Sequence, residues 1–168
     1  TKHGEYKISG NTIILKNNNE ERIAADGFSA LSAIAVSSDL WRLYIADKSK
    51  SCIYAAVISE NGDLNNIKKI ASLQLPTDFN YPGAFDICVD RNDRIFAATE
   101  LGIQCIRTFG LVDLIMPLPD NKIPDNISLS GNVLYAESKG EIFRRKIKSS
   151  EKEDMFKIDE PKFTEYYD

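Results

Sequence analysis

A pair of short strands joined by a polar turn occurs three times in the sequence. Each copy begins with a run of β-branched and aromatic residues, passes through a turn of charged or small residues, and continues into a second such run. The copies span residues 42–57, 94–106 and 132–146. Apolar runs bounded by turn residues predict antiparallel β-hairpins. The sequence therefore predicts an all-β fold made of repeating units.

Each hairpin is preceded by a further short apolar strand, and the first two hairpins are followed by a fourth, more amphipathic one. The preceding strands cover residues 33–36, 87–89 and 127–129, and the following strands cover residues 67–73 and 111–118. Four short antiparallel strands that repeat at roughly 40–50 residues are typical of a β-propeller blade. We therefore predict about three four-stranded antiparallel blades.

The two ends of the chain differ from these units. Residues 5–8 and 12–15 predict a hairpin that supplies outer strands of a preceding blade. From residue 149 the composition becomes strongly charged, and the last residues contain aromatics without a clear period. We therefore predict a partial propeller over residues 1–148 and a charged linker and tail over residues 149–168.

Composition narrows the classes of partner and of chemistry. The net charge of −4, from 25 acidic and 21 basic residues, argues against a nucleic-acid partner. No apolar run reaches the ~20 residues of a membrane helix, so we expect a soluble protein, cytoplasmic or exported, without a membrane partner. The single histidine, His3, cannot form a Ser-His-Asp or Cys-His site within the strands. Three cysteines without C-x-x-C spacing predict buried free thiols.

Two longer segments each combine an inner strand with the first strand of a hairpin. They are Leu31–Asp47, LSAIAVSSDLWRLYIAD, and Gly83–Thr99, GAFDICVDRNDRIFAAT. The first resembles Pro-Asn-Gly-Leu-Ala-x-Ser-x-Asp followed by Leu-Tyr-Val-Ala-Asp, and the second resembles Ala-Asp-Gly-x-x-Val-Asp-x-x-Gly-x-Leu-Tyr-Val-Ala-Thr. Both stretches are typical of the gluconolactonase and regucalcin (senescence marker protein) family. The resemblance runs from about residue 4 to residue 148. It corresponds to the carboxy-terminal half of a six-bladed member, and it implies half of a six-bladed propeller.

The resemblance also implies a metal site. Family members hydrolyse lactones or related esters with one divalent cation, often calcium, held by oxygen ligands from different blades. Two of the four ligand positions fall on Ser32 and Phe85. Because a serine hydroxyl is a weak ligand and phenylalanine has no donor atom, we predict that the family ligands are replaced. Asp86, one residue further on, is the candidate metal ligand. The remaining ligands would come from blades outside this chain.

The other acidic residues favour structural roles. Asp90 and Asp93 lie in a tight turn, where aspartate is favoured because its side chain bonds nearby backbone. Asp47 and Glu137 follow strands of two copies, which predicts a repeated role at the strand end.

Two functions remain open. The first is a degenerate propeller segment with a role in binding or assembly. The second is a divalent-metal-dependent lactonase or ester hydrolase, acting on a lactone or sugar and completed by other blades or another chain. Three blades would leave two open faces. We expect a second copy, the remaining blades or the tail to cover them, and we expect these faces to be lined by Ile34, Val36, Ile87, Val89, Ile127 and Leu129.

Overall fold

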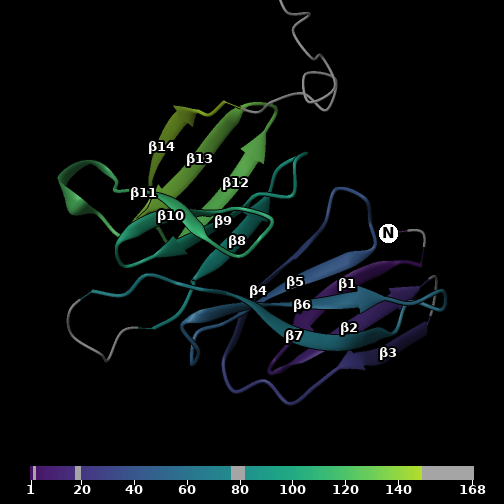
Figure 1. Cartoon of the computed structure of the whole chain (residues 1–168). Helices are drawn as coiled ribbons and strands as arrows, with labels where there is room; N and C mark the ends of the chain where they lie inside the picture. Colours follow the sequence, from purple (N-terminus) through teal and green to yellow (C-terminus); the bar gives the residue numbers. More distant parts are fainter. Residues whose placement is uncertain (2, 18–19, 77–81, 149–168) are drawn as a thin grey trace, which may run out of the picture.

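The structure, a computed structural model, describes residues 1, 3–17, 20–76 and 82–148. Its regular structure is almost entirely β (Figure 1). No α-helix occurs in these residues, and their one helical element is a 3-10 turn at Pro119–Asn121. None of the described residues lies in a helix long and apolar enough to cross a membrane. The all-β class is confirmed, whereas the predicted linker and tail lie outside the described residues.

Within the described ranges, fourteen strands form four antiparallel sheets. The first sheet contains β1 (Glu5–Ser9), β2 (Thr12–Asn17) and β3 (Glu20–Ala25). The second contains β4 (Leu31–Val36), β5 (Arg42–Asp47), β6 (Cys52–Ile58) and β7 (Leu64–Ser72). The third contains β8 (Asp86–Val89), β9 (Ile95–Thr99), β10 (Gly102–Ile106) and β11 (Val112–Met116). The fourth contains β12 (Asn126–Ser130), β13 (Val133–Ser138) and β14 (Glu141–Lys146). Within every sheet each strand pairs with the next one in sequence.

The three predicted hairpins are the second and third strands of the last three sheets, β5–β6, β9–β10 and β13–β14. Their registers are equivalent, because an isoleucine near the start of each second strand faces the same point of the first. Ile53 lies opposite Ala46, Ile103 opposite Ala98, and Ile142 opposite Glu137. The repeat inferred from sequence is thus a repeat of structure.

Two details differ from the prediction. The strand β3 was not expected, because Glu20, Glu21 and Arg22 give it no apolar alternation, and its side chains are exposed or half-buried. It is held by pairing with β2 and by an ion pair between Arg22 and Asp63 of the neighbouring sheet. The fourth sheet has three strands in the described residues instead of four.

The first strands of the last three sheets meet one another. β8 contacts β4 on one side and β12 on the other (Figure 1). The remaining strands of each sheet extend away from this line in sequence order. This is the arrangement of propeller blades, whose innermost strands surround a central channel.

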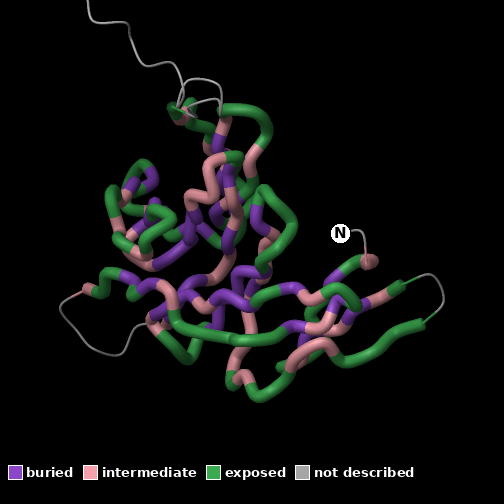
Figure 2. Tube along the Cα trace, turned by 45° about the vertical axis from the view of Figure 1, so that its right-hand side comes forward, coloured by how far each residue is buried: buried purple, intermediate pink, exposed green. Residues whose placement is uncertain are grey.

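Three apolar cores lie between neighbouring sheets. Leu43 and Ile45 of β5 pack toward the first sheet, whereas Tyr44 and Ala46 of the same strand pack toward the third. Consecutive residues of a strand point to opposite faces, so this one strand contributes to two cores. Figure 2 shows buried segments along the middle of the stacked sheets.

The apolar residues of the inner strands lie in these cores and not on the open faces, which corrects the expectation from sequence. Each inner strand packs against a neighbouring sheet of the same chain, so its side chains are covered within the chain. The residues concerned are Ile34, Val36, Ile87, Val89, Ile127 and Leu129.

Candidate functional site

The two family ligand positions lie where the inner strands begin. Ser32 is an extra residue in β4, because the pairing with β5 passes from Leu31 directly to Ala33. Phe85 precedes β8, and its main-chain N–H donates to the carbonyl oxygen of Ala98 at 2.8 Å. The extra residue Ser32 forms a β-bulge, which turns its side chain out of the regular alternation of β4.

The Ser32 hydroxyl joins two sheets. Its oxygen lies 2.7 Å from the carbonyl oxygen of Ala84 and 3.1 Å from that of Ala46. Both neighbours are acceptors, so the hydroxyl proton is shared between them. Ser32 therefore ties β4 to the residue that precedes Phe85, and the structure brings the two predicted positions side by side.

Phe85 lies beside a cation. The ammonium nitrogen of Lys48 lies 5.3 Å from the centroid of its ring, which is a cation–π distance. The same ring packs against the core between the third and fourth sheets. A positive charge thus stands next to the position where the family places an anionic ligand.

Asp86 uses both carboxylate oxygens to bind main chain. Oδ1 accepts a hydrogen bond from the N–H of Ile87, and Oδ2 accepts one from the N–H of Ile127 in β12, each at 2.8 Å. The side chain therefore links the third sheet to the fourth. The described part of the chain contains no group of three or more His, Cys, Asp or Glu side chains that could hold a metal.

Asp47 organises the approach to Ser32. Its buried carboxylate accepts hydrogen bonds from the N–H groups of Ser29, Ala30 and Ser49 and from the Ser49 hydroxyl, at 2.6–3.0 Å. Burial raises the pKa of Asp47, but these hydrogen bonds lower it more, so the pKa lies below its usual value. Asp47 thus fixes the segment that enters β4.

A polar side chain binds main chain at the end of the first strand in all three hairpins. The equivalent registers place Thr99 and Ser138 where Asp47 stands. Both are buried, and their hydroxyls donate to the carbonyl oxygens of Gly102 and Ile123 at 2.8 and 2.6 Å. Glu137 lies one residue earlier, and its carboxylate accepts hydrogen bonds from the Asn126 side chain and from the Gly140 N–H in the turn that follows β13.

Sequence reasoning missed Gln104, which is fully buried in β10. Its amide nitrogen donates to the Gln74 carbonyl oxygen at 2.8 Å and to the Thr99 hydroxyl at 3.1 Å, and its amide oxygen accepts from the Gln74 N–H at 2.8 Å. The available signal was one amide side chain within the apolar run Gly102–Ile106. Such a residue needs buried partners.

The turn role of Asp90 is confirmed. Its carboxylate accepts from the N–H groups of Asn92 and Arg94 and forms an ion pair with the Arg94 guanidinium at 2.7 Å. Asp93 adopts a positive φ in the same turn, and its carboxylate accepts from the N–H of Ser38 in the neighbouring sheet. The three cysteines are free thiols, as predicted, and Cys88 is less fully buried than the other two.

These sheets, with inner strands in contact and equivalent hairpin registers, define a partial β-propeller. Among solved structures, the fold is similar to a gluconolactonase from Xanthomonas campestris, with a TM-score of 0.68 and 16% identity over 82% of this chain and 45% of that chain. It is also similar to a luciferin-regenerating enzyme, with a TM-score of 0.64 and 16% identity over 76% of this chain and 43% of that chain.

A third similar structure is the calcium-binding protein regucalcin from Agrobacterium tumefaciens, with a TM-score of 0.60 and 13% identity over 77% of this chain and 45% of that chain. The family resemblance is confirmed at the level of the fold. The chain spans less than half the length of each of these three proteins. No family model matches the sequence, and no match was found among curated proteins.

Proposed function

We propose that this chain is a propeller segment with a role in binding or assembly, in which the family's ligand positions connect neighbouring blades. The observation that carries the proposal is the pair of contacts between sheets made by Ser32 and Asp86. Ser32 bonds the main chain ahead of the third sheet, and Asp86 bonds the main chain of the fourth. The side chain at one family ligand position, Ser32, and the side chain next to the other, Asp86, serve here to fix one blade against the next.

The local electrostatics support this proposal. Calcium takes six to eight oxygen ligands, mainly carboxylates and carbonyls. The carboxylate next to the Phe85 position, that of Asp86, already accepts main-chain hydrogen bonds with both of its oxygens. The Lys48 ammonium beside Phe85 adds a positive charge that repels a divalent cation.

The alternative is a calcium-dependent hydrolase of lactones or related esters, completed by further blades or a second chain. It is favoured by the fold, since one similar structure is a gluconolactonase and another is a calcium-binding protein. In that case Asp86 would be the ligand supplied by this chain. The small molecule bound under either proposal would be a lactone or sugar.

Calcium titration by calorimetry, with lactone hydrolysis assayed in parallel, separates the two functions. We expect neither calcium binding nor hydrolysis for the unmodified chain. Asp86→Ala should lower the midpoint of urea unfolding, because the Ile127 N–H loses its acceptor. This midpoint should not respond to calcium before or after the substitution. Calcium binding and hydrolysis that are both present and are both lost in Asp86→Asn would establish the hydrolase instead.

A further inference from the structure

The outer edge of β14 has a vacant strand position among the described residues. In the second and third sheets the third strand pairs with a fourth, β6 with β7 and β10 with β11. β14 pairs with β13 along one edge, and the described residues supply no strand for the other. An unpaired edge presents a row of main-chain donors and acceptors that another strand can use.

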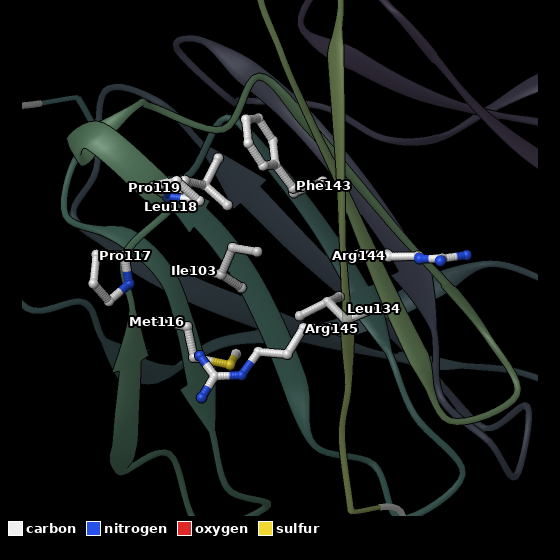
Figure 3. A pocket seen from close by; sticks show the side chains of 10 residues that line it. Ile103, Met116, Pro117, Leu118, Pro119, Leu134, Phe143, Arg144 and Arg145 are labelled. Atoms are coloured by element: carbon white, nitrogen blue, oxygen red, sulfur yellow. The ribbon is translucent and has the colours of Figure 1, made fainter.

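A cavity of about 440 Å³ opens beside this edge. It lies between the third and fourth sheets, and its walls are mostly apolar (Figure 3). Arg144 and Arg145 both line it. Consecutive residues of a strand point to opposite faces of its sheet. Since Arg144 and Arg145 line the same cavity, the cavity reaches the edge of β14, where the two faces meet. Its apolar lining includes Ile103, Met116, Leu118, Leu134 and Phe143.

The sequence after β14 has the length and pattern of a fourth strand. The turns between third and fourth strands, residues 59–63 and 107–111, are equally long in the second and third sheets. A turn of this length after Lys146 starts a strand at residue 152. That alignment places Met155, Phe156 and Ile158 at the positions of Ile115, Met116 and Leu118. Lys152 and Asp154 take the places of Val112 and Leu114, which are half-buried and exposed.

Charge favours the same pairing. Residues 149–168 contain seven acidic residues and three lysines, so they account for the whole net charge of −4. The edge of β14 ends in the basic run Arg144–Lys146. In the third sheet Arg107, just after β10, forms an ion pair with Asp113 of β11 at 2.7 Å. Glu153 takes the place of Asp113 in the alignment, opposite the basic end of β14.

We propose that residues 152–158 pair with the free edge of β14 in the same molecule and complete the fourth blade. In this register, which lacks the irregularity of the third sheet between Cys105 and Ile106, Phe156 lies opposite Ile142, as Met116 lies opposite Ile103. Met155 lies opposite Phe143 and closes the mouth of the cavity, and Phe156 shields Ile142, whose exposed fraction is 75%. This inference is independent of the proposed function, because it concerns the rim of the blade and not the channel.

A pair of cysteines tests the register in the full chain. Directly opposite residues of antiparallel strands have Cβ atoms roughly 4.5–5.5 Å apart, near enough for a disulfide after a small adjustment. We expect Ile142→Cys with Phe156→Cys to form an intramolecular disulfide on mild oxidation at low protein concentration, as identified by peptide mapping. The matched control, Ile142→Cys with Phe163→Cys, should form at least tenfold less.

Other results would overturn the proposal. Equal yields in the two variants would mean that the segment has no fixed register, and a disulfide between two molecules would mean that the edge accepts a strand from another copy. If the cysteine variants fail to fold, urea unfolding of Phe156→Ala and Phe163→Ala decides. Only Phe156→Ala should lower the midpoint, and equal midpoints would contradict the proposal.

Discussion

Asp47 offers the sharpest test of how the segment that enters β4 is held. Asp47→Ala removes the acceptor of four hydrogen bonds, from Ser29, Ala30 and twice from Ser49. A hydrogen bond to a charged group contributes roughly 1.5–3 kcal/mol, but bonds that share one carboxylate are not additive and the freed N–H groups are half-buried. We therefore expect a loss of about 3 kcal/mol.

Asp47→Asn should cost less, about 1 kcal/mol, because its amide oxygen can replace Oδ1 and only the bond from Ser29 to Oδ2 is lost. The control is Asp113→Ala, since Asp113 forms an exposed ion pair with Arg107, a kind of pair that contributes ~0–1 kcal/mol. Urea unfolding followed by far-ultraviolet circular dichroism at pH 7 measures all three variants.

The pH dependence of the Asp47→Asn effect tests the cause. The pKa of Asp47 is lower in the folded than in the unfolded chain, where aspartate titrates near ~3.9. Its contribution to stability is therefore present above that value and is lost as the pH falls through the folded pKa. The difference between the unmodified chain and Asp47→Asn should narrow below about pH 4. A difference that is absent at pH 7, or constant down to acid pH, would refute the reasoning.

Three further outcomes follow from the same structure. Gln104→Leu should lower the unfolding free energy by about 1–3 kcal/mol, because the main chain of Gln74 loses its partner; an unchanged urea midpoint would contradict this. Gly83→Ala should lower the melting temperature, because the added Cβ would lie 2.2 Å from the Lys50 carbonyl oxygen. An unchanged melting temperature would contradict this close contact between Gly83 and Lys50. Burial and then the charges of Asp86 and Asp90 raise the pKa of Cys88 to about 12, so iodoacetamide should label it far more slowly at pH 8 than it labels glutathione.

The repeated hairpins could be predicted from sequence because each carries a dense run of β-branched and aromatic residues. Tyr44 and Phe96, which lie in these runs, are buried between sheets. Trp41 is 56% exposed, because it lies in the turn before β5 and not in the strand. Apolar composition alone does not separate these two environments. The strand β3 was missed for the opposite reason, since charged side chains conceal a pairing that its main chain makes.

The contacts at the inner strands could not be predicted. Ser32 and Ala84 are 52 residues apart in sequence, and Asp86 and Ile127 are 41 apart. Each contact depends on how two sheets are placed relative to one another, and no local pattern encodes this placement. The family alignment directed attention to Ser32 and Phe85, but it did not indicate that Ser32 and Asp86 bind main-chain groups of the next sheet.

The division of the interior into three separate cores affects how the molecule opens. Each core is shared by two adjacent sheets, so stability is a sum of nearest-neighbour terms, as in linear repeat proteins. The second and third sheets are each held from both sides, whereas the described residues support the first and fourth from one side. Amide hydrogens of β5 and β9 should therefore exchange with solvent only on global unfolding, and those of β1 and β14 through partial opening that leaves the middle intact.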